Sequence, residues 1–516
     1  MDDYSYVQHL YQMAEQAAAQ RDWRLLYIAR AELNRVAPSS VNSLWQADAG
    51  RMLGLLPVSG SFGADEISVL QVDGCSLFPN LLATAIELGA LNVCDLASFN
   101  LAQFSGNDRL ITAVAYAILH RGFETSELER LSVSEHPVTQ IRQFEDKSAQ
   151  QISEEYVIDV SKFLSKLQPD IKRVQQVNVE SAQIIRLKNS TVWIESDAIF
   201  VDGQFVIDQA GQLGGLGVNF NSDTRIRSAN NSKVIVTTTR PVNQIRVKKG
   251  LFLAYPMTHA WGHFYRSVLS RLAFALEMYL DGDLDLILSS RVTQAGRDAI
   301  QMLHPKLRLH FFDPNTEIVV EELLVVPSRG FAPEEIMPGF ETDKNRLTTD
   351  IEAMRLIRSR FQQIFKADIS TGNSLYWSRG TANYRKGNSD KILEQRARGL
   401  GLDIADLGNL SILDQGRIVA HAKTSFGFYG SHLNNVATMA PIGSSHLIVT
   451  NDRPYEWQTL YCALSELLEV EPLIVQGHGQ LSLPYYAPEN YHSSTELEFD
   501  QIERISAAMS GESSIS

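Results

Sequence analysis

Apolar residues recur at helical spacing in the N-terminal part of the chain. Residues 6–19 and 23–36 carry apolar side chains every three to four positions and are separated by a short polar break. This spacing predicts two amphipathic helices in a hairpin, and residues 81–88 and 110–119 predict further helices. We therefore interpret residues 1–150 as a helical N-terminal domain. Its helix pair is tetratricopeptide-like in length, although no 34-residue period follows it.

The pattern becomes β-rich in residues 151–250. Short segments with many β-branched side chains alternate here with turns that contain Asn, Asp and Gly; they lie at residues 183–187, 191–194, 198–201 and 233–237. Such segments are typical of strands joined by tight turns. We expect a small β-rich section that precedes the rest of the fold.

Residues 251–368 alternate between buried strands and helices. Continuous apolar runs predict strands at residues 251–255, 285–288, 307–312 and 323–326, and helical spacing predicts helices at residues 263–280 and 294–303. Apolar strands that alternate with helices indicate a parallel sheet covered on both faces. This segment is predicted to be a first Rossmann-like unit.

Residues 369–516 repeat the same alternation after a linking helix at residues 350–365. The predicted strands lie at residues 374–378, 403–406, 424–428 and 446–449, and the helices at residues 389–400, 412–421 and 431–438. The sequence therefore predicts an α/β fold with two Rossmann-like units in tandem that face a cleft. Ligands of such sheets bind at the carboxyl ends of the strands.

Composition and charge narrow the range of functions. The chain has 516 residues, of which 46 are Lys or Arg and 60 are Asp or Glu, so its formal net charge is −14. This charge argues against general nucleic-acid binding, which depends on cations that neutralise phosphates. The three cysteines, Cys75, Cys94 and Cys462, lack the spacing of a zinc cluster and fit the reducing cytoplasm. We expect no transmembrane segment, since no apolar run reaches about 18 residues.

One candidate site lies where the strand at residues 424–428 meets the next helix. Gly427 and Gly430 permit a tight turn and a close backbone approach. A helix that starts near Ser431 would direct free N–H groups and its positive end at the cleft, where a diphosphate would be stabilised. Tyr429 and Asn435 would then shape a donor pocket. The alternative is an ordinary strand-to-helix turn.

Three cations follow the strand at residues 374–378. Arg379 stands at its carboxyl end, and Arg385 and Lys386 follow in a loop rich in Gly and Asn. Three cations at the mouth of a cleft could bind phosphate. The alternative is a solvated basic loop.

Two histidines precede or begin the helix at residues 263–280. His259 and His263 are four residues apart, but the glutamate of the HExxH zinc motif is absent, so we expect no metal site. A histidine at a strand–helix junction can act as a general base. A purely structural histidine is the alternative.

Several of these segments, in this order, resemble glycosyltransferase family 61, which includes capsular-polysaccharide-type enzymes. The similar segments are residues 262–272 (its GHxxx(D/E)xLPRL pattern), 375–379 (YxSR), 385–388, 410–415 (LSFxEQ), and 427–435 with 440–443 (GPHGAALTN, then APPG). The resemblance covers roughly residues 175–455. The chain departs from the pattern where Ser267 replaces an acidic residue, Ser270 a proline, Tyr429 a histidine and Ser389 a glutamate. The acidic residue that usually follows the last strand is also missing near residues 448–449.

The resemblance implies a GT-B architecture, with the acceptor on the first unit and a nucleotide-sugar on the second. It also implies an inverting transfer, of a hexosyl or pentosyl group, without an obligatory metal or other cofactor. The expected acceptor is a glycan or polysaccharide precursor, for example of a capsule. On this hypothesis His263 is the base, with His259 as its alternative. The competing hypothesis is a catalytically inactive glycan- or nucleotide-binding or docking protein on the same fold, and the N-terminal helices could bind a protein partner.

Overall fold

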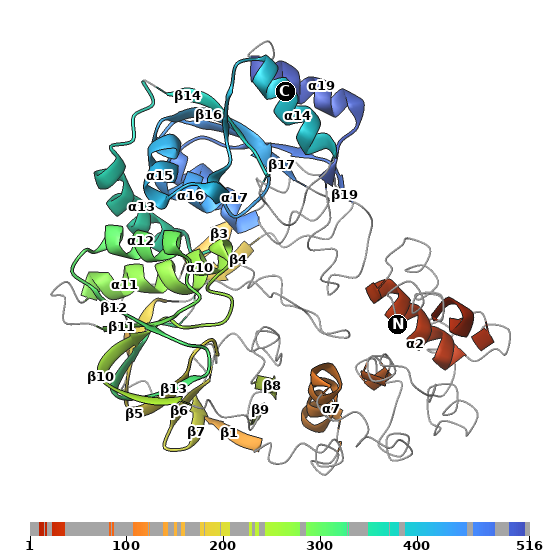
Figure 1. The fold of residues 1–516 in the computed structure, drawn as a ribbon, viewed down its shortest axis with the longest axis vertical. Helices are drawn as coiled ribbons and strands as arrows, with labels where there is room; N and C mark the ends of the chain where they lie inside the picture. The colour runs from red at the N-terminus through yellow and green to blue at the C-terminus, as the bar shows by residue number, and fades with distance from the viewer. Residues whose placement is uncertain are drawn as a thin grey trace.

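The structure is a computed structural model of the 516-residue chain. It describes residues 10–14, 16–17, 23–36, 82–83, 85–86, 107–121, 123, 138–142, 149–151, 156–159, 176–179, 181–196, 198–206, 226–229, 233–236, 243–278, 285–327, 329, 349–370, 372–380, 388–450, 458–479 and 495–510. These residues form a mixed α/β protein with two large sheets, one of them all-parallel (Figure 1). None of the helices in these ranges has the length and apolar character needed to cross a membrane.

The N-terminal part contains two longer described helices, α2 (Trp23–Val36) and α7 (Asp108–Arg121). They confirm the helices predicted over residues 23–36 and 110–119. In α2 the buried side chains Leu25, Ile28, Ala29 and Leu33 are three or four residues apart, as an amphipathic helix requires. Much of the N-terminal region lies outside the described residues, so its domain boundary and its tetratricopeptide-like character stay predictions.

The first large sheet has eleven strands in the order β12-β11-β10-β13-β5-β6-β7-β1-β9-β8, with β2 paired to β5. Its strands are β1 (Val138–Arg142), β2 (Ala149–Gln151), β5 (Gln183–Trp193), β6 (Ile199–Val201), β7 (Gln204–Val206), β8 (Ile226–Ala229), β9 (Lys233–Val236), β10 (Asn243–Phe252), β11 (Asp285–Ser289), β12 (Arg308–Phe312) and β13 (Thr316–Val325). Strands β12, β11, β10 and β13 are parallel, and β13 pairs with β5 in the antiparallel direction.

The sheet of the first unit is therefore mixed, whereas the sequence predicted an all-parallel one. Strands β10 and β13 extend several residues ahead of the predicted strands; these first halves pair with each other, and that of β13 also pairs with β5. Cross-strand ion pairs connect the three strands, since Glu322 on β13 lies 3.2 Å from Lys249 on β10 and 3.8 Å from Arg186 on β5. The β-rich segment and the first unit thus share one sheet.

The second large sheet is all-parallel, with the order β15-β14-β16-β17-β18. Its strands are β14 (Asn373–Trp377), β15 (Asp403–Ala405), β16 (Ala422–Phe428), β17 (Ser445–Thr450) and β18 (Leu473–Gln476). Four of them confirm predicted strands, and β18 was not predicted. Two-stranded sheets are formed by β3 (Tyr156–Asp159) with β4 (Gln176–Val179) and by β19 (His478–Gly479) with β20 (Thr495–Glu496).

Helices cover both faces of the parallel sheet. The helical segments from residue 261 onward are α10 (Trp261–Phe264), the π-helical η4 (Tyr265–Leu269), α11 (Ser270–Met278), α12 (Gln294–Leu303), α13 (Ile351–Phe365), α14 (Asn388–Gly399), the 3-10 turn η6 (Leu407–Asn409), α15 (Ile412–Ala420), α16 (Leu433–Met439), α17 (Gln458–Leu468) and α19 (Phe499–Ser510). Helices α14 and α19 share an apolar cluster with one face of this sheet, and α15, α16 and α17 with the other.

One apolar core joins the two units. It contains side chains of α11 and α12 from the first unit, of the linking helix α13, and of α15, α16 and α17 from the second. Figure 1 shows these helices between the two large sheets, with α14 and α19 on the far side of the parallel sheet. The two units are thus held against each other by buried helices, and a ligand-binding cleft between them stays a prediction.

Candidate functional site

The topology of the parallel sheet marks one place where a ligand is expected. The chain leaves β14 through α14 to reach β15, and then returns through α15 to β16 on the other side of β14. This reversal makes the border between β14 and β16 a topological switch point, where the loops diverge and open α/β sheets bind their ligands. Residues 378–380 follow β14 at this point, and residues 429–431 follow β16.

Arg379 and Gly430 meet at the switch point. The Nη1 of Arg379 donates a hydrogen bond of 3.2 Å to the carbonyl oxygen of Tyr429. A Cβ atom on Gly430 would clash with that same Nη1, so only glycine permits this approach. A Cβ on Gly427 would lie 2.8 Å from Trp377 Cβ, which explains the second glycine. The structure therefore brings together Arg379 and the glycine turn that the sequence singled out.

Two of the predicted phosphate-binding cations cannot be placed. Arg385 and Lys386 lie outside the described residues. Tyr429 is 8% exposed, and its ring centroid lies 6.3 Å from that of Tyr461 on α17. Ser431 is the exposed residue of this turn, while its neighbours Gly430 and Leu433 are buried. The turn is therefore tightly packed and presents Ser431 to its surroundings.

His432 is a site residue that the sequence analysis missed. Its ring centroid lies 5.8 Å from that of Trp377, and its Nδ1 would be 3.0 Å from a Cβ on Gly430. Burial, followed by the charges of Arg379 and His446, lowers the pKa of His432 to about 3. Its Nε2 is shielded from solvent and has no hydrogen-bond partner among the described residues. Its place two residues after the glycine of a strand-to-helix turn was the only sequence signal for it.

The start of α16 differs from the prediction. The helix begins at Leu433 rather than near Ser431. The backbone N–H groups of Leu433, Asn434 and Asn435 donate to the carbonyl oxygens of Gly430, Ser431 and His432. These amides are therefore engaged within the turn, and the expectation of free helix donors at these three positions is wrong. Positive charge at the switch point comes instead from the Arg379 side chain.

Asn435 connects the two units. Its side-chain oxygen accepts a hydrogen bond of 2.9 Å from the indole Nε1 of Trp261, and its amide nitrogen donates one of 2.6 Å to Gln415. Asn435 is only 1% exposed. A second hydrogen bond between the two units lies nearby, where the Tyr265 hydroxyl is 3.1 Å from the Thr438 hydroxyl. Both ends of the Asn435 amide thus bind protein, which makes it a structural link at the place where a donor contact was expected.

The predicted base lies on the first unit next to this link. His263 belongs to α10, is half-buried, and follows Gly262, where a Cβ would come within 3.4 Å of Ser431 Cβ. The helix turn that carries His263 therefore abuts the glycine turn of the second unit. His259 lies in the preceding loop and is exposed. The predicted helix over residues 263–280 begins two residues earlier and contains the π-helical segment η4, a feature often found near functional sites.

Arg271 occupies the corresponding switch point of the first unit. Strand β10 is flanked by β11 on one side and by β13 on the other, so the chain reverses at the border of β10 and β13. The Nε of Arg271 donates to the Val326 carbonyl at 2.9 Å, just beyond β13, and its guanidinium lies 3.5 Å from the ring centre of Tyr255, just beyond β10. Its Nη1 also donates to the Ser267 carbonyl at 2.9 Å. This buried cation is therefore held just beyond the carboxyl ends of β10 and β13.

The described part of the chain contains no group of three His, Cys, Asp or Glu side chains that could hold a metal ion. The arrangement at the second switch point is a guanidinium at the ends of two parallel strands, beside a glycine turn that the helix turn carrying His263 approaches from the other unit. Such a cation can stabilise an anionic group.

A comparison with protein families finds one match. Residues 261–444 match the family described as Glycosyltransferase 61. The match runs from the first residue of α10 to the residue before β17, so it includes His263, Arg379 and the glycine turn. It covers about a third of the chain and confirms the central part of the resemblance seen in the sequence. Such a match implies glycosyltransferase activity. No curated protein matches the chain.

Proposed function

We propose that the protein is an inverting, metal-independent glycosyltransferase of GT-B architecture that moves a sugar from a nucleotide-sugar to a glycan or polysaccharide precursor. The observation that carries this proposal is the position of Arg379 at the switch point of the parallel sheet, bonded to Tyr429, within a segment that matches the glycosyltransferase family. The nucleotide-sugar would bind the second unit and the acceptor the first. The cysteine content supports a cytoplasmic location.

The proposed reaction is a single displacement at the anomeric carbon. His263 takes the proton from an acceptor hydroxyl as that oxygen forms its bond to the anomeric carbon. The bond between this carbon and the diphosphate oxygen breaks on the opposite face, and the nucleoside diphosphate leaves with one additional negative charge. Arg379 stabilises this charge, and Arg385 and Lys386 follow it closely enough in sequence to contribute.

Transfer from a panel of nucleotide-sugars to oligosaccharide acceptors, read by mass spectrometry of the products, tests the proposal. Arg379→Ala and His263→Ala should each lower turnover by about a hundredfold or more. Arg417→Ala is the matched control for the arginine, since Arg417 is a surface residue paired with Asp414. His259→Ala separates the two histidines. Unchanged transfer in both Arg379→Ala and His263→Ala would contradict the assignment.

The rival function is a glycan- or nucleotide-binding protein without turnover. It is favoured by Ser267 and Tyr429, which stand where the resembling family has an acidic residue and a histidine, and by Arg271, which is buried at the switch point of the first sheet. Calorimetry with the same nucleotide-sugars, together with an assay for donor hydrolysis, separates the two functions. Binding without transfer or hydrolysis supports the rival.

A further inference from the structure

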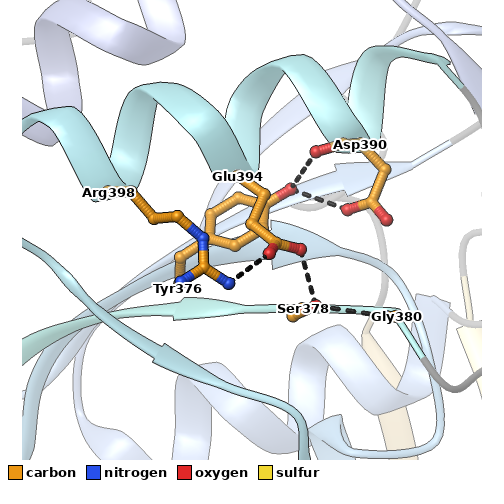
Figure 2. Close-up of polar contacts among 6 residues, drawn as sticks. All are labelled: Tyr376, Ser378, Gly380, Asp390, Glu394 and Arg398. Carbon is orange, nitrogen blue, oxygen red and sulfur yellow. Dashed lines mark hydrogen bonds and ion pairs between the residues drawn. The ribbon is translucent and has the colours of Figure 1, made fainter.

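Two hydroxyl–carboxylate hydrogen bonds fix helix α14 to β14 and to Ser378, the residue that follows this strand (Figure 2). The Tyr376 hydroxyl donates to Asp390 at 2.7 Å, and the Ser378 hydroxyl donates to Glu394 at 2.7 Å. Tyr376 lies on β14, Ser378 is the residue that follows this strand, and the two acceptors are four residues apart on the helix. Figure 2 shows the helix running in the opposite direction to the strand, so the long Tyr376 side chain reaches forward to Asp390 near the start of the helix, while the short Ser378 side chain bonds Glu394 one turn further along it.

Both hydrogen bonds have an acidic side chain as the acceptor; the Tyr376–Asp390 bond is buried and the Ser378–Glu394 bond is partly buried. Tyr376 is fully buried and Asp390 is 5% exposed. Burial, followed by the nearby charge of Asp390, raises the pKa of Tyr376, which therefore stays a donor. For Glu394, burial acts to raise the pKa, but the hydrogen bonds from Ser378 and Arg398 outweigh it and lower the pKa. Glu394 is thus a charged acceptor at neutral pH.

The Ser378–Glu394 hydrogen bond lies at the switch point, because Ser378 is adjacent to Arg379. The Ser378 oxygen also accepts a hydrogen bond of 3.1 Å from the backbone N–H of Gly380, which closes a turn around Arg379. Residues 376 and 378 face α14, while Trp377 between them bonds Ser425 with its indole nitrogen at 2.7 Å and has its ring beside His432. Arg379 likewise reaches the Tyr429 side. One side of this strand end is therefore anchored to α14, and the other side carries Arg379.

We propose that Ser378 and Glu394 are positioning residues that hold the turn of residues 378–380 and thereby fix the Arg379 guanidinium against the Tyr429 carbonyl. This inference rests on the proposed function only in giving Arg379 a diphosphate to bind. The Tyr376–Asp390 bond already fastens the helix to the strand. The second bond differs from it because Ser378 is adjacent to Arg379 and its oxygen closes the turn around that residue.

The test compares Ser378→Ala and Glu394→Gln with Arg396→Ala in the full-length chain. Arg396 is the matched control, since it lies on the same helix and pairs with Glu503 and Ser506 on α19 rather than with β14. The first readout is the rate at which phenylglyoxal modifies Arg379, followed by peptide mass spectrometry. Ser378→Ala and Glu394→Gln should raise this rate several-fold while Arg396→Ala leaves it unchanged. Wild-type rates in both variants would overturn the proposal.

The second readout is the affinity for UDP and for GDP, measured by calorimetry. We expect Ser378→Ala and Glu394→Gln to bind the preferred nucleotide about tenfold more weakly, and Ser378→Thr to restore binding. Weak binding by Arg379→Ala but wild-type binding by both positioning variants would overturn this inference and leave the proposed function standing. If the wild-type chain binds neither nucleotide, the donor site of the proposed function fails, and the modification rate alone decides whether Arg379 is positioned in this way.

Discussion

The indole nitrogen of Trp261 donates a 2.9 Å hydrogen bond to the side chain of Asn435, and this bond joins two helices that are 174 residues apart in sequence. Trp261 starts the segment that carries His263, and Asn435 lies in the first turn of α16, just after the glycine turn beside Arg379. This hydrogen bond, the neighbouring contact between the Tyr265 and Thr438 hydroxyls and the apolar core around them therefore hold the segment that carries the candidate base against the second unit.

Trp261→Phe should lower the free energy of unfolding by about 1–3 kcal/mol, because it keeps an aromatic ring but leaves the buried Asn435 oxygen without this donor. Urea denaturation of the purified chain measures the change. A double-mutant cycle with Asn435→Ala isolates the pair, and we expect an interaction energy of about 1 kcal/mol. Strict additivity of the two changes would contradict an energetic role for this hydrogen bond.

Gly430→Ala should displace Arg379 and weaken nucleotide binding. The added Cβ would clash with the Arg379 Nη1 and lie 3.0 Å from the Nδ1 of His432, so at least one of these side chains must move. We expect a loss of about tenfold or more in affinity for UDP or GDP, measured by calorimetry. Gly399→Ala is the control, because a Cβ there meets nothing within 4 Å. Equal affinities in the two variants would argue against Arg379 as a ligand.

Gly416→Ala should destabilise the contact between α13 and α15. The new methyl group would overlap the ring of Phe365. Overpacking of this kind costs about 1–3 kcal/mol, which a thermal or urea unfolding experiment detects. Phe365→Leu introduced together with Gly416→Ala should recover part of the loss, since the smaller side chain makes room. Phe365→Leu could instead lower the stability of Gly416→Ala as much as it lowers that of the wild-type chain. In that case the clash between the methyl group and the Phe365 ring is not the cause of the destabilisation.

The strands of the second unit could be predicted from the sequence because their central residues are buried on both faces of the sheet. Strand β14 ends in a buried run at residues 375–377 and β16 in a buried run at residues 425–428, as expected of parallel strands between two helix layers. The first half of β10 has no such signal. It carries Arg and Lys side chains on a largely exposed surface and is held by pairing with β13, a strand distant in sequence, which periodicity does not report.

The candidate site was predicted in outline and not in its hydrogen bonds. Arg379 and Gly430 could be placed together because both end neighbouring parallel strands. The engaged amides at the start of α16 depend on tight-turn bonds to residues 430–432, and the role of Asn435 depends on Trp261 in the other unit. These contacts are set by tertiary packing, so no local pattern could show them.

His446 is held in one tautomer beneath the site. The Ser444 hydroxyl donates to the Pro441 carbonyl at 2.7 Å, so its oxygen must accept the hydrogen bond from His446 Nε2 at 2.8 Å. The unprotonated Nδ1 then accepts from Ser425, 2.6 Å away, whose oxygen accepts from the Trp377 indole. All these polar atoms are satisfied by a neutral imidazole. Burial, followed by the charge of Arg358, lowers the pKa of His446 to about 3.

Replacement of His446 by Gln should therefore make the stability of the protein less sensitive to acid. Between about pH 6.5, the ordinary histidine pKa, and pH 3, the unfolded chain binds a proton at this residue and the folded chain does not. In this range the free energy of unfolding therefore falls by about 1.4 kcal/mol for each unit by which the pH decreases. This contribution is fully present above pH 6.5, and His432, whose pKa is also lowered, adds a second one of the same sign.

Urea titrations at several values from pH 7.5 to 5.0 should give His446→Gln a lower free energy of unfolding at neutral pH. Its dependence on pH should be shallower than that of the wild-type chain by about 1.4 kcal/mol per pH unit. A slope equal to that of the wild-type chain would mean that His446 is charged in the folded protein, which the hydrogen bonds from Ser425 and to Ser444 do not accommodate.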